Sequence, residues 1–284
     1  MKWIKELRVT HYLKNALVFV PVFFSGSGMS FACLKTILIS FICFCMGASA
    51  IYLMNDIKAV EKDRMHPVKR YRPLATGEIS VYAARCVSIG LVVFAFLLLF
   101  LFRIEINGIA VFSFYLLINY LYSVRGWKHV PLIDVSILVL GFYLRVLMGA
   151  VVVHIEISPW LSLVIITGAG FLAFGKRRNE QKVMGDETRK VLRAYPAGFL
   201  DKAMYACMVM TNIFFALWCV LEKTKYYLLL FPLVMLLCLR YCMDLEQEQN
   251  QGDPMDVILE DKVLFAIGAS AGVIMLCLLY ILRV

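Results

Sequence analysis

Residues 33–54, CLKTILISFICFCMGASAIYLM, contain one charged residue, Lys35, and lead directly into the charged stretch NDIKAVEKDRMHPVKRYRPLATGE at 55–78. A helix needs about 20 apolar residues to cross the hydrocarbon core of a bilayer. The apolar run therefore predicts a membrane-spanning helix. The carboxylates and basic residues that follow it are typical of a segment at the membrane edge, where water-soluble molecules can be reached.

Composition extends this interpretation to the whole chain. The 284 residues are 62% hydrophobic, with a mean hydropathy of +0.79, whereas a soluble domain averages about half apolar residues. Seven further runs suit spanning helices, at about 81–102, 106–122, 131–150, 157–174, 203–221, 226–243 and 263–282. A shorter apolar run at 16–25 brings the number to nine. We therefore predict an all-α membrane protein with nine transmembrane helices in a single domain, residues 1–284.

The distribution of lysine and arginine predicts the orientation of these spans. With the N-terminus on the cytosolic side, most of the 29 Lys and Arg residues fall in cytosolic segments. These segments are 1–15, 55–80, 123–130, 175–202 and 240–262. Because cytosolic loops carry an excess of Lys and Arg, the pattern predicts a multi-pass protein with its N-terminus inside and its C-terminus outside. An eight-helix arrangement without the first run would put two basic segments on opposite faces.

The net charge of +9 indicates anionic partners. The basic residues lie in short loops between apolar spans, so membrane lipids or anionic substrates are favoured and nucleic acid is not. At the N-terminus, MKWIKELRVTHYLKN places Trp3, Ile4 and Leu7 on one helical face. This pattern predicts an interfacial helix over residues 1–14 on the cytosolic leaflet.

Two predicted cytosolic loops, 55–80 and 175–202, are much longer than a simple connection requires. If the helix continues past residue 54, Asp56 and Asp63 lie on one face, and their oxygens, with that of Asn55, suit Mg²⁺. Four basic residues follow: His66, Lys69, Arg70 and Arg72. Acidic groups followed by basic groups suit a magnesium diphosphate, since guanidinium groups bind phosphate oxygens. The alternative is a solvated loop that only obeys the positive-inside rule.

Other candidate binding residues lie near the predicted cytosolic ends of the spans. They are Lys14, Asn15, Tyr122, Lys128, Asp134, Lys176, Arg177 and Glu180. Headgroup anchoring is the alternative for Lys14, an interfacial aromatic role for Tyr122, and topology alone for part of the basic cluster. Arg145 lies deep in an apolar span, where an arginine usually has a partner and a function. An acceptor phosphate and a structural pair with Asp134 are both open to it.

The charged stretch resembles the first aspartate motif of the UbiA-type intramembrane prenyltransferases. The resemblance rests on Asn55-Asp56, Asp63 and the basic segment that ends at Arg72-Pro73. The HPVKRYRP version, with LRVTHYLKN, YSVRGWKHVPLIDVSILVLGFYLRVLMGA and GKRRNE elsewhere, resembles one branch, the decaprenyl-phosphate phosphoribosyltransferases. The resemblance implies a nine-helix bundle in a bacterial-type cell membrane, with a cytosolic active-site cavity. Homo-oligomerisation is left open.

The resemblance also implies a reaction. In that branch, 5-phosphoribose moves from phosphoribosyl diphosphate to a polyprenyl (decaprenyl-like) phosphate, with Mg²⁺ as cofactor and diphosphate as the product released. The implied catalytic residues are Asp56, Asp63, Arg72 and Arg145. The implied metal ligands are Asn55, Asp56 and Asp63. The remaining candidates named above, from Lys14 to Glu180, would bind the two substrates.

One position departs from the family pattern. Ala59 stands where the family has an aspartate, which leaves Asn55, Asp56 and Asp63, with or without Glu61, to hold the metal. The chain is then weakened, has diverged, or carries a disabling change. An aromatic prenyltransferase that uses a prenyl diphosphate is a second hypothesis, although Leu138 and Phe142 replace the further acids expected after Asp134. A non-catalytic lipid-binding or transport protein is a third, which Ala59 favours.

Overall fold

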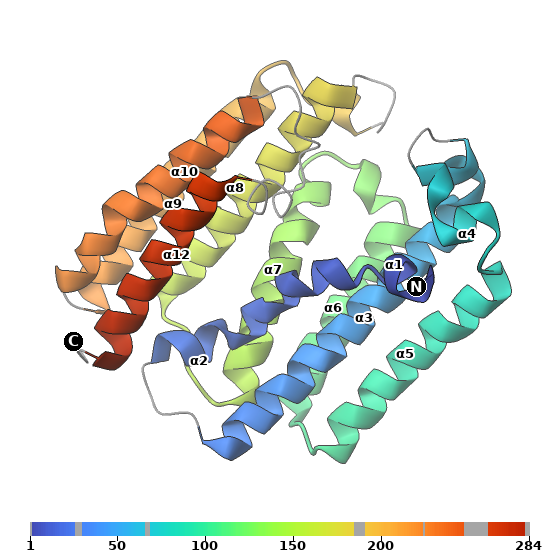
Figure 1. Cartoon of the computed structure of the whole chain (residues 1–284), viewed down its shortest axis with the longest axis horizontal. Coiled ribbons are helices and arrows are strands. Elements are labelled where there is room, and N and C mark those ends of the chain that lie inside the picture. The colour runs from blue at the N-terminus through green and yellow to red at the C-terminus, as the bar shows by residue number, and fades with distance from the viewer. Residues whose placement is uncertain are drawn as a thin grey trace. The chain divides into compact units, whose positions relative to one another are not determined.

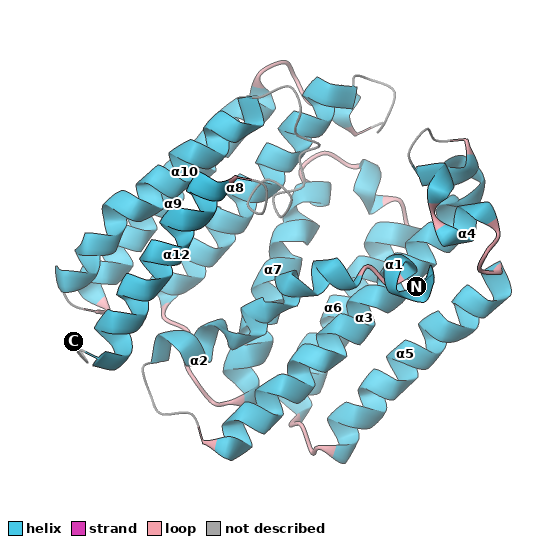
Figure 2. Ribbon diagram, viewed as in Figure 1, coloured by secondary structure: helices cyan, strands magenta, loops and turns pink. Residues whose placement is uncertain are grey.

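The computed structural model describes residues 2–25, 30–65, 69–184, 191–223, 225–246 and 261–281. Within these ranges the chain is helical and contains no strand (Figure 2). Eight helices are long and apolar enough to cross a membrane. They are Phe31–Arg64, Val81–Leu101, Ile106–Val124, Ile133–Val152, Pro159–Lys182, Phe199–Leu221, Lys225–Glu246 and Lys262–Ile281. The prediction of an all-α membrane protein is confirmed.

The apolar run 16–25, the ninth predicted span, is not among these eight helices. It forms the end of a 3-10 helix, η1 (Val9–Phe19), and a short α-helix, α2 (Val20–Ser25). Pro21 lacks an N–H, which the first turn of α2 tolerates. At about 2.0 Å per 3-10 residue and 1.5 Å per α-helical residue, η1 and α2 laid end to end would reach about 30 Å. The number of nine spans stays a prediction.

The chain divides into two compact units. The first comprises Met1–Gly126 and Leu144–Glu156, and the second comprises Trp127–Tyr143 and Ile157–Val284. Helix α7 (Ile133–Val152) begins in the second unit and ends in the first. A single transmembrane domain over the whole chain stays a prediction.

The first unit is built around α3 (Phe31–Arg64), which at about 1.5 Å per residue is roughly 50 Å long. This length exceeds the hydrocarbon core of a bilayer, which is about 30 Å thick. The predicted loop 55–80 therefore begins as a helical extension of the span. The other elements of this unit are α1 (Lys2–Glu6), η1, α2, η2 (Lys69–Tyr71), α4 (Pro73–Thr76), α5 (Val81–Leu101), α6 (Ile106–Val124) and the end of α7 (Figure 1).

Two glycines allow close packing inside the first unit. Gly149 of α7 lies against the backbone of η1, where an added Cβ would collide with the carbonyl oxygen of Val18. Gly47 of α3 lies against the ring of Phe112 in α6, which an added Cβ would approach to 3.0 Å. Because a side chain at either position needs its neighbours to shift, these glycines fix η1, α3, α6 and α7 against one another.

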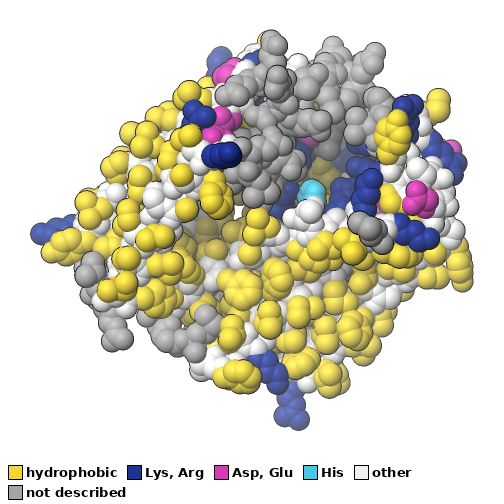
Figure 3. All heavy atoms as spheres, viewed as in Figure 1, with side chains coloured by type: hydrophobic (Ala, Val, Ile, Leu, Met, Phe, Trp, Pro, Cys, Tyr) yellow, Lys and Arg dark blue, Asp and Glu magenta, His cyan; other side chains and the backbone are white. Residues whose placement is uncertain are grey.

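The N-terminal segment is held on the protein. Trp3 and Leu7 pack against a cluster formed by Leu53, Leu74, Ile79 and Ala84. Of the three apolar residues predicted to share one helical face, only Ile4 is largely exposed. Helix α1 ends at Glu6, so the predicted interfacial helix over residues 1–14 is not one continuous α-helix. In Figure 3, Lys and Arg side chains gather around α1 and α4, beside a broad apolar surface. This basic region adjoins the end of α3.

The second unit packs α8 (Pro159–Met184) along α9 (Phe199–Leu221), and its core includes Phe171, Met204, Tyr241, Leu245 and Leu264. Its other elements are η3 (Trp127–His129), the start of α7, η5 (Leu192–Ala194), η6 (Lys225–Leu230), α10 (Phe231–Glu246), α12 (Lys262–Leu276) and the π-helical η7 (Cys277–Ile281). Helix α8 continues to Met184. The predicted loop 175–202 is therefore helical at its start.

Candidate functional site

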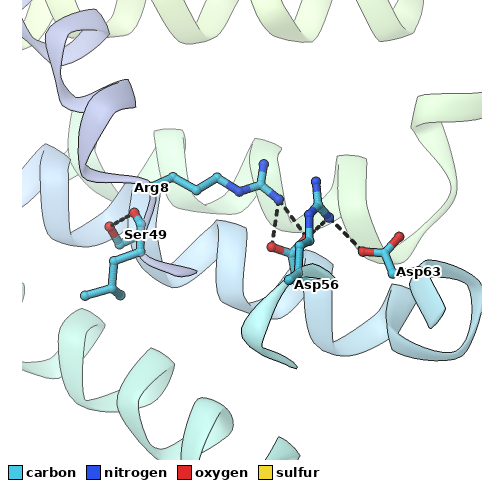
Figure 4. Close-up of polar contacts among 6 residues, drawn as sticks. Arg8, Ser49, Asp56 and Asp63 are labelled. Atoms are coloured by element: carbon cyan, nitrogen blue, oxygen red, sulfur yellow. Dashed lines mark hydrogen bonds and ion pairs between the residues drawn. The ribbon is translucent and has the colours of Figure 1, made fainter. Parts of the chain in front are cut away.

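Two carboxylates and two guanidinium groups meet at the end of α3 in the first unit. Asp56 and Asp63 are both buried. Arg8 Nη2 donates to both Asp56 oxygens, at 2.8 and 2.7 Å. Arg72 Nη1 bridges the two acids, 2.8 Å from Asp56 Oδ1 and 2.7 Å from Asp63 Oδ2 (Figure 4). Helix α3 continues through both acids, so the prediction that they share one face is confirmed.

Local backbone geometry places both arginines. Arg72 precedes Pro73 and takes the extended conformation that a following proline favours, with φ −71° and ψ 141°. Arg8 lies between α1 and η1 in the left-handed region, with φ 53° and ψ 51°. An arginine there is strained, and such strain tends to occur at functional positions.

Contacts on α3 hold the backbone beside Arg8 in place. Ser49 Oγ donates to the Leu7 carbonyl oxygen at 2.8 Å, and the same hydroxyl lies 2.8 Å from the Tyr12 hydroxyl. Figure 4 shows the contact of Ser49 with this backbone beside α3, together with the Arg8–Asp56 pair. The turn between α1 and η1 is therefore tied to the helix that carries the two acids.

A third carboxylate, that of Glu6, lies near this cluster. The side chain is buried, with 2% of its surface exposed. Burial, and then the negative charge of Asp56, raise the pKa of Glu6, whereas the Leu74 backbone N–H, Arg8 and Arg72 act in the opposite direction. Spacing in the sequence did not indicate Glu6 or Arg8. Both come from the N-terminal segment, whose role was predicted as membrane contact.

The remaining predicted residues of this stretch differ in their surroundings. Asn55 is partly buried on α3, next to Asp56. Lys69 is also partly buried. Arg70 is exposed and donates to the Tyr71 hydroxyl at 2.6 Å. Glu61 is exposed and pairs with Arg64 at 3.0 Å. His66 lies outside the described residues.

Arg145 forms a separate buried polar site in the first unit. Its Nε donates to Asn15 Oδ1 at 2.7 Å, and its Nη2 donates to the Tyr115 hydroxyl at 3.0 Å. The guanidinium also lies over the Tyr115 and Phe44 rings, 4.9 and 5.9 Å from their centroids. Asn15 is thus held by Arg145, while Lys14 Nζ lies 3.5 Å from His11 Nδ1.

Replacing Arg145 with lysine is expected to destabilise the protein. The lysine keeps the charge but loses the planar fork that binds Asn15 and Tyr115 together. A hydrogen bond to a charged group contributes about 1.5–3 kcal/mol, so the midpoint of thermal unfolding in detergent should fall clearly. Arg85→Lys is the matched control, because Arg85 lies exposed on α5. Equal midpoints for the two variants would contradict the structural role of these contacts.

A second polar network lies in the second unit. Asp134 is completely buried and accepts hydrogen bonds from Arg177 Nε at 2.5 Å and from the Tyr195 hydroxyl at 2.8 Å. Arg177 Nη1 also donates to Glu180 at 2.8 Å. The Tyr195 hydroxyl accepts from the Leu132 backbone N–H at 2.7 Å. Three predicted residues, Asp134, Arg177 and Glu180, are therefore brought together.

Tyr195 is the member of this network that sequence reasoning missed. Burial, with a smaller contribution from the negative charge of Asp134, raises the pKa of Tyr195 to about 12, so its hydroxyl keeps its proton. The sequence left open a structural pair between Arg145 and Asp134. In the structure Asp134 instead pairs with Arg177, 43 positions along the chain.

The remaining candidates are partly buried: Tyr122 in the first unit, and Lys128 and Lys176 in the second. The neighbouring Arg178 binds Asp201 at 2.6 Å and also pairs with Glu246. Much of the basic cluster at 176–178 therefore has partners inside the second unit.

The sequence model of the UbiA prenyltransferase family matches residues 16–258. The chain belongs to the UbiA prenyltransferase family. A decaprenyl-phosphate phosphoribosyltransferase from Corynebacterium glutamicum is 34% identical over 272 residues, which cover 92% of this chain and 81% of the relative. One from Mycolicibacterium smegmatis is 30% identical over 281 residues, covering 92% and 87%.

Solved UbiA structures support the same fold. A UbiA homolog from Archaeoglobus fulgidus bound to GPP and Mg²⁺ has a TM-score of 0.73 at 18% identity and covers 97% of both chains. The same homolog bound to DMAPP and Mg²⁺ has a TM-score of 0.69 at 18% identity, over 97% of this chain and 96% of the homolog. This UbiA family chain therefore has the fold of proteins that hold a divalent cation.

The donor atoms at the end of α3 fit such a cation by their chemistry. Mg²⁺ prefers hard oxygen ligands and usually takes one or two carboxylates together with substrate phosphates. Asp56 and Asp63 supply two carboxylates, and Asn55 an amide oxygen. Across the described ranges, no three His, Cys, Asp or Glu side chains are grouped closely enough to hold a metal by themselves. Arg8 and Arg72 hold the carboxylates in this structure.

Proposed function

We propose that this chain transfers 5-phosphoribose from phosphoribosyl diphosphate to a polyprenyl phosphate, with Mg²⁺ as cofactor and diphosphate as the product released. The observation that carries the proposal is the cluster of Asp56, Asp63, Arg8 and Arg72. It combines oxygen ligands for a cation with two forked phosphate-binding groups. The names of the curated relatives support phosphoribose as the group transferred.

Asp56 and Asp63, with Asn55, would hold the cation against the donor diphosphate. The bound Mg²⁺ would neutralise negative charge on the diphosphate as it departs. Arg8 and Arg72 are each about one quarter exposed, at 24% and 28% of their side chains, so the diphosphate can reach both. Their guanidinium groups would exchange carboxylate oxygens for phosphate oxygens and stabilise the developing charge.

The transfer itself needs one bond to break and one to form. The bond between ribose C1 and the diphosphate oxygen breaks, and an oxygen of the lipid phosphate bonds to C1. The lipid phosphate is already anionic, so the reaction needs no strong general base. This requirement agrees with a cluster made of carboxylates and guanidinium groups.

We assign Arg145 to the acceptor side. Asn15 and Tyr115 accept hydrogen bonds from the guanidinium and hold it in position. A buried cation of this kind would attract the phosphate of a lipid acceptor. Asp134, Arg177 and Glu180 are instead assigned a positioning role, since Asp134 and Arg177 are buried and bonded to one another.

The proposed placement has the Asp56 cluster on the cytosolic side of a bacterial-type cell membrane. The excess of Lys and Arg in segments 1–15 and 55–80 supports this orientation. Phosphoribosyl diphosphate, a soluble substrate, would then enter from the cytosol, while the lipid tail would lie among the helices.

Purified protein in nanodiscs is expected to bind phosphoribosyl diphosphate only when Mg²⁺ is present, and to release diphosphate when decaprenyl phosphate is added. Calorimetry with and without EDTA measures the binding, and a coupled diphosphate assay measures the reaction. Equal binding with EDTA would contradict the metal's role. GPP provides the comparison, because a solved homolog binds it. Tighter binding of GPP, with transfer to an aromatic acceptor, would identify a prenyltransferase instead.

A further inference from the structure

Three basic residues follow one another at three-residue intervals where the chain enters η1. They are Arg8, His11 and Lys14. Side chains three residues apart share one face of a 3-10 helix, which rises about 2.0 Å per residue, so the row is about 12 Å long. The backbone N–H of His11 donates to the Arg8 carbonyl oxygen at 2.9 Å, which closes the first turn. Because Arg8 binds Asp56, the row begins at the Asp56 cluster.

The Tyr52 ring of α3 contacts the first two residues of this row. The Arg8 guanidinium lies over the ring, 4.7 Å from its centroid. The His11 ring meets it edge-on, with centroids 5.6 Å apart and planes at 65°. Tyr52 precedes Asp56 by four residues, so the two side chains lie on one face of α3. His11 is therefore held next to the guanidinium group that binds the first acid of the cluster.

Lys14 ends the row and determines which nitrogen His11 offers as a donor. Its Nζ lies 3.5 Å from His11 Nδ1. An ammonium group only donates hydrogen bonds, so Nδ1 accepts in this contact and the ring carries its hydrogen on Nε2. The imidazole N–H and the ammonium group can then donate to one anion. Both side chains are partly buried, where such bonds are stronger than in bulk water.

The next residue, Asn15, belongs to the acceptor side. It is buried, and its Oδ1 accepts from Arg145 Nε at 2.7 Å. His11 and Lys14 instead share a row with Arg8, to which we assign the donor diphosphate. A phosphate held by this row would therefore belong to the molecule that carries the diphosphate. Phosphoribosyl diphosphate has such a group, the 5-phosphate, across its ribose from the diphosphate, whereas a prenyl diphosphate has an apolar chain instead.

We propose that His11 and Lys14, beside the Tyr52 ring, bind the 5-phosphate of the donor and so select a phosphorylated sugar over a prenyl diphosphate. The inference rests on the proposed function, which supplies the identity of the donor. Arg8 would bind the diphosphate end, and His11 and Lys14 the other end, from one face of one segment. Hydrogen bonds from such groups to phosphate are charge-assisted, so they contribute to affinity as well as to orientation.

Calorimetry with phosphoribosyl diphosphate, ribose 5-phosphate and inorganic diphosphate tests the proposal. The full chain is measured with Mg²⁺ in nanodiscs of phosphatidylcholine, whose headgroup has no net charge and cannot compete for the row. His11→Phe keeps an aromatic ring against Tyr52 but removes both nitrogens. It should weaken binding of the two ribose phosphates about 10-fold or more, the effect of losing a hydrogen bond to a charged group, and leave diphosphate binding unchanged.

Two further variants serve as comparisons. His11→Gln keeps an N–H donor but loses the ring, so it should lose less affinity for the ribose phosphates than His11→Phe. The reverse order would show that His11 acts only by packing against Tyr52, and would overturn the proposal. His154→Gln is the matched control, because His154 is an exposed histidine of the same unit, and it should bind all three ligands as the unaltered chain does.

Three other results would also overturn the proposal. Unchanged binding of phosphoribosyl diphosphate by His11→Phe would show that His11 does not contact the donor. An equal loss of diphosphate binding would show that His11 only positions Arg8. A higher KM for decaprenyl phosphate, with donor binding kept, would assign the row to the acceptor. If His11→Phe does not fold, Lys14→Met decides: weaker ribose 5-phosphate binding with unchanged diphosphate binding supports the proposal, and any other pattern overturns it.

The same measurements distinguish this proposal from the proposed function. Binding of ribose 5-phosphate that depends on His11, in a chain that transfers no phosphoribose, would overturn the function and keep the phosphate subsite. Transfer of phosphoribose by His11→Phe with the KM of the unaltered chain for phosphoribosyl diphosphate would keep the function and overturn the subsite.

Discussion

Exchanging Asp56 for asparagine is expected to lower kcat/KM for phosphoribosyl transfer by more than about 100-fold, since even groups that only support metal ligands cost about 10–100-fold when altered. Asp56 has the larger role of the two acids on α3, because it binds both Arg8 and Arg72. Asparagine keeps the size but presents an NH₂ group to guanidinium donors, so it loses one acceptor and all the charge. The cation and both arginines would be misplaced together.

Kinetics at several Mg²⁺ concentrations, with Mn²⁺ binding measured separately, would show this effect. Asp63→Asn should cost less, since among the described residues Asp63 forms an ion pair with Arg72 but not with Arg8. Glu78→Gln, on an exposed side chain, serves as the control for loss of an acid in the same segment. Transfer by Asp56→Asn within a few-fold of the unaltered chain would remove Asp56 from the metal site and with it the proposed mechanism.

Local sequence patterns were sufficient to predict the long helices and to place Asp56 and Asp63 on one face of α3. Apolar runs of about 20 residues predicted the eight long helices because spanning helices must bury their backbone polar groups internally. The seven-residue spacing of Asp56 and Asp63 was also informative, because residues seven apart lie on the same face of a helix. The helix end was harder to place, and α3 continues ten residues beyond the predicted span end at residue 54.

Contacts between distant segments could not be predicted in this way. Arg8 reaches Asp56 across 48 positions, and its left-handed backbone conformation has no glycine to indicate it. Arg145 was weighed as a partner for Asp134 because both lie on one predicted helix. The structure instead pairs Asp134 with Arg177, from another helix. Tertiary packing decides such partners, and spacing along one helix carries no information about the helix that packs beside it.

The contacts of the second unit lead to a large expected effect on stability. Replacing Arg177 with methionine should lower the free energy of unfolding by about 3–5 kcal/mol, because it leaves a buried carboxylate without its charged partner. Asp134 has 0% of its surface exposed and Arg177 has 1%, so water cannot take the place of the missing group. Of the two side chains in the described part of the chain that donate to Asp134, the Tyr195 hydroxyl would remain.

Denaturant unfolding in detergent would measure this loss, with Lys182→Met as the matched control. Lys182 pairs with Glu246 at 2.8 Å, but both side chains are 48% exposed, and such surface pairs contribute about 0–1 kcal/mol. Combining Arg177→Met with Asp134→Leu should recover much of the stability, since an apolar pair often replaces a buried ion pair without cost. If the double variant also keeps its affinity for phosphoribosyl diphosphate, the network positions helices only. If affinity is lost while stability returns, Asp134 and Arg177 contact substrate, and their assignment to a positioning role is wrong.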